Sequence, residues 1–407
     1  MVSASGGAIG WGRAASSIVV CLVVGVAVVS GCTTRRPDVE LTEVAATPSP
    51  TAAPSPSPTV APPRSFTLIG SGDVLLHSGL WAQAAADAAA AGQPGMDFRP
   101  LFAAVRPVVA GADLAICHLE TPVATPDGPF SSYPTFNVPP QVVSALADLG
   151  YDSCSTASNH SLDKGEPGVV RTLAALDAAG IQHAGTARHP GERASVTLLR
   201  GPHGVRVAHL SYTYSFNGLP LPRRKPWLAN PLVVSTILTD ARSARIVGAD
   251  VVVVSLHFGT EYQHAPNSYQ ITVAKALLAS PDVDLILGHH AHVVQPLEKI
   301  GDKWVAYGMG NQVSFQNQSG DTRDGIMPRF TFTEDTDGRF VVTRVEVVPL
   351  HMWLSGSPVR LYDVAAALSS PGTPSGIRSA CAASLQRTRS VLGMRGAYED
   401  GLILVGG

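Results

Sequence analysis

Three histidines stand together directly after an apolar run, and their types and spacing suit metal binding. The run at 283–286 leads into Leu287-Gly288-His289-His290-Ala291-His292, so two of the imidazoles are spaced His-x-His. Neutral imidazole is a ligand for Mn, Fe, Zn and Ni, and alternate residues at the end of a strand can converge once the chain turns. The alternative for this segment is a structural histidine pair held by hydrogen bonds. Repetition of the pattern elsewhere favours the metal site.

Four further apolar runs end at residues that bind metals or move protons. In chain order they present Asp73, Glu120, Asn159-His160 with Asp163, and His257 with Glu261. Taken singly each is weak, because a lone Asp after glycine is more often a turn residue or a helix cap. In open α/β sheets, ligands bind outside the carboxyl ends of the strands, and all five groups occupy that position. Together they predict one site.

Strands and helices alternate in the part of the chain that must position these groups. Strands are predicted at 66–70, 113–119, 151–156, 250–255 and 283–286, and helices at 80–91, 140–149, 168–179, 235–247 and before 279. Hairpins are predicted at 196–210, 293–307 and 329–348. Early βα alternation followed by later hairpins favours an α/β sandwich with a mixed sheet.

Longer motifs resemble the CapA family (poly-γ-glutamate capsule synthesis protein), a branch of the calcineurin-like metallophosphoesterase superfamily. The motifs are Asn159-His160-Ser161-Leu162-Asp163-Lys164-Gly165, His257-Phe258-Gly259-Thr260-Glu261-Tyr262, His290-Ala291-His292-Val293-Val294-Gln295-Pro296 and Tyr307-Gly308-Met309-Gly310-Asn311. The resemblance runs from about residue 66 to residue 316. It implies a metallophosphoesterase-like four-layer αββα sandwich with mixed sheets.

The resemblance also implies a set of metal ligands and a cofactor. The implied ligands are Asp73, Glu120, Asn159, His257, His290 and His292. Asp73 would bind a first cation together with His292, Glu120 would bridge two cations, and the others would hold the second. The cofactor would be one or two divalent ions, with Mn, Fe or Zn favoured. Two such ions activate a bridging water and stabilise both the attacking and the leaving oxygens.

Other residues are implied to act on the substrate. His160 would donate a proton to the leaving group, with Asp163 keeping its imidazole in the right tautomer. Glu261 and Gln270 are candidates for substrate contacts, with a hydrogen-bonding structural role as the equal alternative. Asn311 is expected to frame the pocket.

Two positions depart from the phosphoesterase pattern. Superfamily enzymes carry Asp-x-His at the first motif, whereas Asp73 is followed by Val74 and Leu75. His77 is the candidate substitute for the missing imidazole. The bridging position is Glu120, where Asp is usual. The first cation site is therefore expected to be loose, mononuclear or empty, which leaves catalytic activity open.

The residues before 64 are predicted to target and anchor the protein. Arg13 precedes an apolar run at 18–29, which is shorter than the roughly 20 residues of a membrane span. The small residues before Cys32 resemble a bacterial lipobox, which implies a signal peptide at 1–31 and lipidation of Cys32. Ordinary secretion or an uncleaved anchor is the alternative.

The remaining chain is divided into three parts. A stretch rich in Pro, Ser, Ala and Thr at 32–63 is predicted to be a stalk. A CapA-like metallophosphoesterase domain is predicted at 64–350, followed by a C-terminal helical extension at 351–407 that packs on it.

The composition of the chain bears on two questions, namely whether it binds nucleic acid and whether its cysteines are free. The net charge is −2 and no basic face is indicated, which excludes a nucleic-acid partner. Cys117 and Cys154 lie in apolar runs and are predicted to be buried, inert thiols. Because these two and Cys381 make an odd number, at least one free thiol or an intermolecular bond is expected in an oxidising compartment, and the disulfide state of all three stays open.

Two functions follow from these expectations. The first is a lipid-anchored, metal-dependent hydrolase at the extracytoplasmic face of the bacterial membrane, acting on a phosphoester or on an anionic envelope polymer of the poly-γ-glutamate type. The alternative is a non-catalytic binding or export component of a surface-polymer synthesis complex, with the membrane subunits of the polymer synthase as partners.

Overall fold

The computed structural model describes residue 38 and residues 62–407. The predicted signal peptide, Cys32 and nearly all of the predicted stalk lie outside this part of the chain. Within it, no helix combines the length and the apolar character that crossing a membrane requires.

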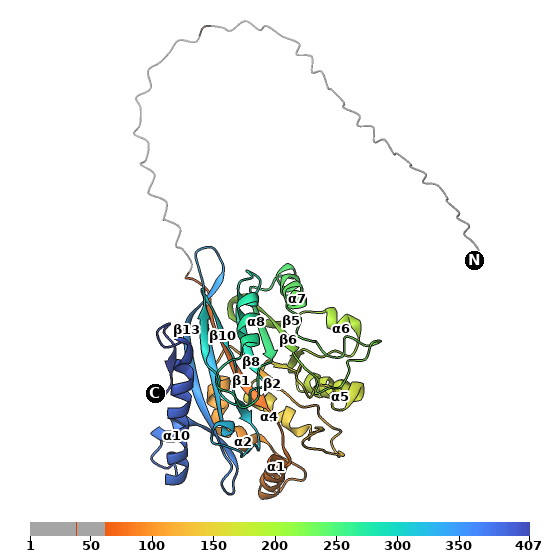
Figure 1. Cartoon of the computed structure of the whole chain (residues 1–407), viewed down its shortest axis with the longest axis vertical. Helices are drawn as coiled ribbons and strands as arrows, with labels where there is room; N and C mark the ends of the chain where they lie inside the picture. Colours follow the sequence, from red (N-terminus) through yellow and green to blue (C-terminus); the bar gives the residue numbers. More distant parts are fainter. Residues whose placement is uncertain (1–37, 39–61) are drawn as a thin grey trace, which may run out of the picture. The chain divides into compact units, whose positions relative to one another are not determined.

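Two mixed β-sheets form the centre of the fold (Figure 1). The nine-stranded sheet has the order β14 (Arg360–Asp363), β13 (Phe340–Trp353), β12 (Asp324–Glu334), β1 (Ser65–Val74), β2 (Leu114–Leu119), β3 (Ser153–Ser155) and β4 (Gln182–Ala184), with β11 (Asn311–Val313) beside β1 and β15 (Ile403–Leu404) beside β13. The six-stranded sheet has the order β5 (Thr197–Arg200), β6 (Arg206–Thr213), β7 (Val251–His257), β8 (Leu285–His289), β10 (Lys303–Ala306) and β9 (Leu297–Ile300). Strands β1 to β4 are parallel to one another, as are β6, β7, β8 and β10.

Helices cover the outer faces of both sheets. They are α1 (Ser78–Ala90), α2 (Arg99–Phe102), α3 (Arg106–Ala110), α4 (Gln141–Leu149), α5 (Gly165–Ala178), α6 (Pro190–Ala194), α7 (Val234–Ile246), α8 (Ser268–Leu278), α9 (Val364–Ser369) and α10 (Ser375–Leu392). Leu146 of α4 and Leu173 of α5 pack against the nine-stranded sheet. Ala241 of α7 and Ala274 of α8 pack against the six-stranded sheet.

The valine run of β7 shows how the sequence produces these layers. Val251 and Val253 belong to the apolar layer between the two sheets, whereas Val252 and Val254 pack toward α7 and α8. Successive residues of a strand point to opposite faces, so an unbroken apolar run is the pattern of a strand covered on both sides. The predicted four-layer αββα sandwich with mixed sheets is confirmed.

The predicted elements are confirmed to within a few residues. The five predicted strands are β1, β2, β3, β7 and β8, and the three hairpins are β5–β6, β9–β10 and β12–β13. The segment 351–407 contains helices α9 and α10 and also strands β14 and β15 of the larger sheet. The boundary placed between 350 and 351 falls inside β13.

The free thiols predicted at Cys117 and Cys154 are wrong, because the structure joins these residues in a disulfide. They are register partners on the adjacent parallel strands β2 and β3, and their Cα atoms are 4.5 Å apart, a separation that a disulfide can span. The apolar runs showed that both residues are buried but could not show which strands are neighbours. Cys381 is buried and unpaired within the described residues.

Candidate metal centre

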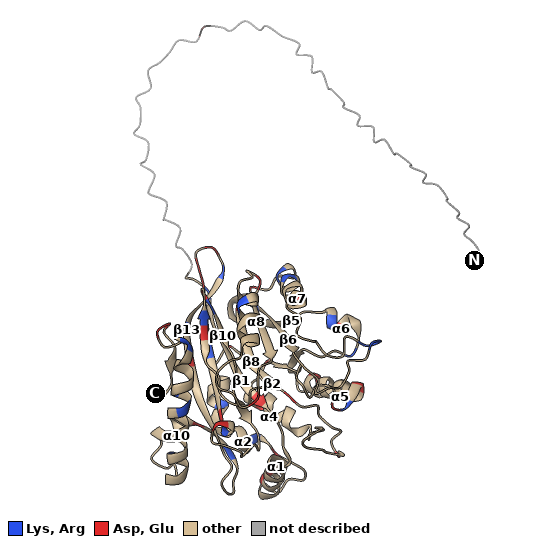
Figure 2. Ribbon diagram, viewed as in Figure 1, with Lys and Arg blue, Asp and Glu red and all other residues tan. Residues whose placement is uncertain are grey.

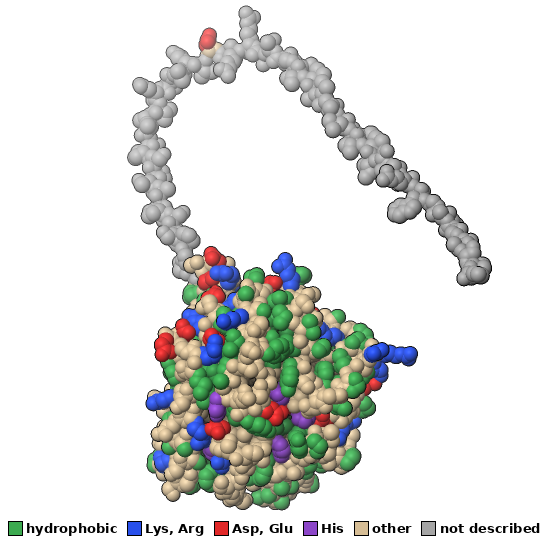
Figure 3. Space-filling view, in the orientation of Figure 1, with side chains coloured by type: hydrophobic (Ala, Val, Ile, Leu, Met, Phe, Trp, Pro, Cys, Tyr) green, Lys and Arg blue, Asp and Glu red, His purple; other side chains and the backbone are tan. Residues whose placement is uncertain are grey.

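The predicted residues meet at the carboxyl ends of four strands, β1 and β2 of the nine-stranded sheet and β7 and β8 of the six-stranded sheet. Asp73 lies near the end of β1, Glu120 directly follows β2, and His257 is the last residue of β7. The His-rich segment continues from the end of β8. Both carboxylates and His257 are almost completely buried. Figure 2 marks acidic residues in red on the ribbon close to the labels of β1 and β2, and Figure 3 shows histidine and acidic atoms gathered near the middle of the face in view.

Asp73 is the centre of one group of these side chains. Its Oδ2 lies 3.1 Å from Nδ1 of His292 and its Oδ1 lies 3.3 Å from Nδ1 of His289. The backbone N–H of His290 donates to Oδ2 over 3.2 Å. Burial opposes ionisation of Asp73, but the neighbouring imidazoles outweigh burial and hold its pKa well below the usual value. Asp73 is therefore a carboxylate.

Glu120, which follows the neighbouring strand β2, belongs to the same group of side chains. Its Oε1 lies 3.7 Å from Nε2 of His292. Burial, reinforced by the charge of Asp73, raises the pKa of Glu120 well above its usual value. Burial opposes protonation of His292, but the two carboxylates outweigh it and raise its pKa to about 10. The metal-free cluster therefore holds at least one proton that a cation would displace.

A second group lies beside the first. Nε2 of His257 is 3.0 Å from Oδ1 of Asn159, and Nε2 of His290 is 2.9 Å from the hydroxyl of Tyr214. Burial lowers the pKa of His290 to about 3, so its imidazole is neutral, as a metal ligand must be. Ligand atoms of His290, His292 and Glu261 lie within 4.8 Å of one another.

The turn after β8 is strained where it presents its imidazoles. His290 has a φ of 91° and His292 a φ of 55°, a region that costs non-glycine residues about 1–3 kcal/mol each. Gly288, just before this turn, allows the backbone of β8 to pass close to that of Tyr307, since a Cβ at this position would lie 2.0 Å from the carbonyl oxygen of Tyr307. Such strain is typical of sites whose surroundings fix the geometry for function.

Several buried polar atoms in the centre have no hydrogen-bond partner among the described residues. They are Oδ1 of Asp73, both carboxylate oxygens of Glu120, both ring nitrogens of His289 and Nδ1 of His290. Unpartnered buried polar atoms are rare and costly. Carboxylate and imidazole donors within reach of one another are what a divalent cation requires. The residues present therefore fit a divalent metal.

Two histidines of this centre had no assigned role in the sequence analysis. His118 lies between the sheets, with Nε2 3.0 Å from Nδ1 of His257 and Nδ1 2.8 Å from Oγ of Ser155. It therefore orients His257, as second partners of metal-bound imidazoles do. His289 stacks on His118 with ring centroids 4.1 Å apart. The only sequence signal for His289 was its place in the run of three histidines.

The predicted proton donor lines a cleft of about 710 Å³ beside this cluster, together with Asn159 and Glu261. Nδ1 of His160 is 2.8 Å from Oδ2 of Asp163, and the backbone N–H of Phe136 donates to the same oxygen over 2.7 Å. Phe136 also contacts the imidazole edge to face, with ring centroids 4.7 Å apart. The predicted His160–Asp163 pair is thus formed and held in place.

Three other candidates occupy different positions. Gln270 is fully buried, caps α8 and donates to Oε1 of Gln295 over 2.7 Å, which favours the structural alternative over a substrate contact. Oδ1 of Asn311 is 3.0 Å from Nδ1 of His292, so Asn311 supports the cluster from below the cleft. His77 lines the cleft, but its Nδ1 already accepts from the N–H of Phe315.

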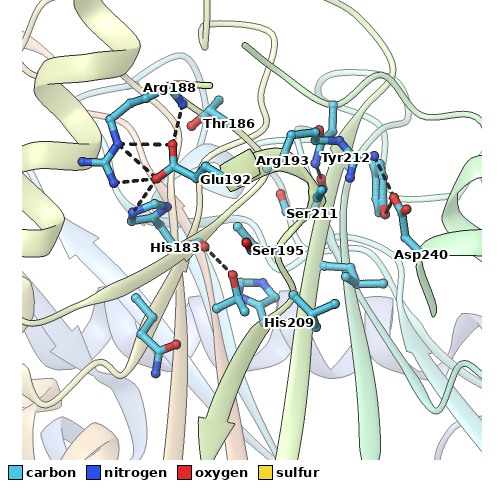
Figure 4. A pocket seen from close by; sticks show the side chains of 18 of the residues that line it. His183, Thr186, Arg188, Glu192, Arg193, Ser195, His209, Ser211, Tyr212 and Asp240 are labelled. Atoms are coloured by element: carbon cyan, nitrogen blue, oxygen red, sulfur yellow. Dashed lines mark hydrogen bonds and ion pairs between the residues drawn. The ribbon is translucent and has the colours of Figure 1, made fainter. Parts of the chain in front are cut away.

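Another cavity, of about 520 Å³, lies between β4, β5 and β6 and is covered by α6 (Figure 4). Its arginines are neutralised: Arg188 pairs with Glu192, and Arg193 donates to Oδ2 of Asp240 over 2.7 Å. None of the predicted metal or catalytic residues lines it. The chemistry predicted from the sequence therefore belongs to the cleft at the strand ends.

Comparisons with known proteins place the chain in a family. Residues 67–316 match the family model described as bacterial capsule synthesis protein PGA_cap. The chain is 26% identical over 252 residues to the PGA biosynthesis protein CapA of Bacillus subtilis, covering 61% of this chain and 65% of that protein. It is 28% identical over 265 residues to the capsule biosynthesis protein CapA of Bacillus anthracis, covering 63% and 62%. The matched stretch thus spans less than two thirds of either relative.

Solved structures with detectable similarity are more distant. A phosphatase from Mycoplasma pneumoniae aligns with a TM-score of 0.42 at 12% identity, covering 71% of this chain and 94% of that one. A calcineurin-like phosphoesterase from Bacillus subtilis aligns with a TM-score of 0.40 at 14% identity, covering 81% and 98%. Because the family model spans more than half of the chain, the protein belongs to the PGA_cap (CapA) family of bacterial capsule synthesis proteins.

Proposed function

We propose that this protein is a metal-dependent hydrolase that cleaves a phosphoester bond in the metabolism of a capsule or other cell-envelope polymer. The proposal rests on one observation: the predicted proton donor lies next to the metal centre. The His160–Asp163 pair and the Asn159 side chain line one cleft, and Asn159 is 3.0 Å from His257 of the metal centre.

The metal centre and the His160–Asp163 pair would act on different atoms of the substrate. The cation, once held by Asp73, Glu120 and the imidazoles, supplies Lewis-acid polarisation and an activated water. Asp163 occupies Nδ1 of His160, so Nε2 is the nitrogen left to deliver a proton to the leaving oxygen. The imidazole of His257 is kept neutral for metal binding, because burial lowers the pKa of His257 and of its partner His118 well below the usual value.

The proposed location is the extracytoplasmic face of the bacterial membrane, with an acyl anchor at Cys32. The small residues before Cys32 support this location. The disulfide between Cys117 and Cys154 also supports it, since such bonds persist in oxidising compartments. The names of two relatives, a PGA biosynthesis protein and a capsule biosynthesis protein, favour a partner within a polymer-synthesis complex.

The test combines metal content with turnover of a chromogenic phosphodiester by the full chain after loading with Mn, Fe or Zn. We expect His160→Ala to keep its bound metal while turnover falls about 10²- to 10⁴-fold. His203→Ala, in the exposed β5–β6 turn, is the matched control and should keep both. Full activity of the His160→Ala protein would refute the assignment.

A second candidate function is supported by the first motif. Leu75 stands where the Asp-x-His pattern has a histidine ligand. This favours a metal-containing binding or export component that has no catalytic activity. In that case Glu120→Gln abolishes binding of an anionic polymer such as poly-γ-glutamate, and the metal-loaded wild-type protein hydrolyses none of the phosphoesters tested.

A further inference from the structure

The cleft beside the metal centre has an unusual charge for a protein linked to an anionic polymer. Among the described residues that line it there is no lysine and no arginine. Of its two carboxylates, that of Asp163 is buried and paired with His160, whereas that of Glu261 is exposed. Beyond the cation, and the imidazolium of His160 while it holds the proton of the proposed mechanism, the cleft therefore offers no positive group to a chain that carries a carboxylate on every unit.

Aromatic rings form the rim of this cleft instead. Tyr133, Tyr262 and Phe315 line it with 75%, 48% and 37% of their surface exposed, and Leu219 joins them. Large apolar side chains gathered around a cleft mark a binding surface. Tyr262 is fixed there with a φ of 63°, and its N–H donates to the carbonyl oxygen of Ala291 over 2.8 Å. One wall of the rim is thus tied to the metal-binding turn.

Amide side chains line the same cleft as these rings. The cleft is lined by Asn217, Gln316 and Gln318. Nε2 of Gln316 donates to the hydroxyl of Tyr262 over 3.2 Å, and Nδ2 of Asn159 donates to Oδ1 of Asn217 over 3.2 Å. An amide carries both donors and acceptors, so this surface can pair with groups that also carry both.

Three classes of ligand can be compared with this surface. A polyanion would place its carboxylates beside Glu261, and no lysine or arginine lines the cleft to compensate them. An alkyl chain would cover the rings but also the exposed amides of Asn217 and Gln318, at a cost of about 1–3 kcal/mol for each polar group left unpaired. A sugar satisfies both requirements, because its C–H faces pack on aromatic rings and its hydroxyls both donate and accept.

We propose that the aromatic and amide-lined cleft binds an uncharged sugar unit of the substrate, next to the phosphoester held at the metal centre. The inference rests on the proposed function for the bond that is cleaved, but the sugar contact is independent of turnover. It makes the substrate a sugar phosphoester rather than a poly-γ-glutamate chain. The negative charge of such a substrate is concentrated at the phosphate, where the cation is.

The test is binding of neutral oligosaccharides, including the tetramer of N-acetylglucosamine, to the full chain by calorimetry, in parallel with a γ-linked glutamate tetramer. We expect saturable binding of at least one neutral oligosaccharide, unchanged between low and high salt. Tyr133→Ala should weaken it roughly five- to tenfold, the size of a lost aromatic contact. Tyr133→Phe retains the ring and should bind normally, as should Tyr269→Ala, an exposed tyrosine of α8 that does not line the cleft.

Two outcomes overturn the inference. One is that no neutral oligosaccharide binds. The other is that the glutamate tetramer binds more tightly than any sugar, with an affinity that falls as salt is added. Either result leaves phosphodiesterase activity, and with it the proposed function, to stand on its own test. Sugar binding without any turnover would instead retain the inference and refute the proposed function.

Discussion

Nδ1 of His289 lies 3.3 Å from Oδ1 of Asp73, although the two residues come from strands of different sheets. Neither ring nitrogen of His289 has a hydrogen-bond partner, and neither has Oδ1 of Asp73. Two residues after Asp73, at the position of the histidine in the Asp-x-His pattern, this chain has Leu75. The facing sheet therefore supplies an imidazole at the aspartate that the motif leaves without one.

The first prediction follows from this relationship. His289→Ala should weaken binding of the cation next to Asp73 by at least about tenfold, because one of its nitrogen donors is lost. Metal content after dialysis against limiting Mn measures the effect. His77→Ala is the matched control and should retain the metal, since the Nδ1 of His77 already accepts from a backbone N–H. Loss of metal in His77→Ala with retention in His289→Ala would reverse the assignment.

Metal affinity should rise with pH. The raised pKa of Glu120 and the raised pKa of His292, about 10, mean that the metal-free cluster carries a proton at neutral pH that binding must release. A raised pKa keeps the proton on below that pKa, so binding competes with protonation more strongly as the pH falls. Calorimetry in two buffers of different ionisation enthalpy should show proton release at pH 7 and weaker binding at pH 5.5. Binding that is independent of pH would contradict this protonation state.

Tyr214 should tune the metal ligand His290. The tyrosine hydroxyl is 2.9 Å from Nε2, which leaves Nδ1, an atom without a protein partner, to face a cation. Tyr214→Phe removes the partner that fixes the ring and should lower metal affinity about tenfold, with little effect on stability. Tyr269→Phe serves as the control, because Tyr269 lies on α8 outside the cleft. Equal affinities of the two variants would show that Tyr214 does not orient the ligand.

The disulfide should contribute measurably to stability. It joins β2 and β3 across 37 residues, and closing a loop of this length stabilises the folded state by about 2–4 kcal/mol. We expect reductant to lower the denaturant midpoint of the wild-type protein. The Cys117→Ala/Cys154→Ala protein should be less stable and insensitive to reductant. A wild-type midpoint that is the same with and without reductant would show that the bond is absent in solution.

Much of the fold could be read from the sequence because its signals are local. Period-two or unbroken apolar runs identify strands such as β7, and Gly180 ends a helical pattern close to where α5 stops. The order of strands within a sheet is not local. The adjacency of β2 and β3, and with it the disulfide, depends on packing between segments that are far apart in the chain.

The same division applies to the site. Residue type and position at a strand end predicted that Asp73, Glu120 and His257 would meet, because parallel strands end at one edge. The sequence could not show that Gln270 is turned inward as a helix cap.

The sequence by itself determined the layered α/β architecture and the chemical types gathered at the strand ends, since both follow from short-range patterns. Only the tertiary structure decided which face of one sheet meets which face of the other. That packing sets His289 beside Asp73 and His118 beside His257. It also surrounds the cleft with aromatic and amide side chains from separate loops. Contacts of this kind join residues whose separation along the chain carries no periodic signal, so they emerge only when the two sheets pack.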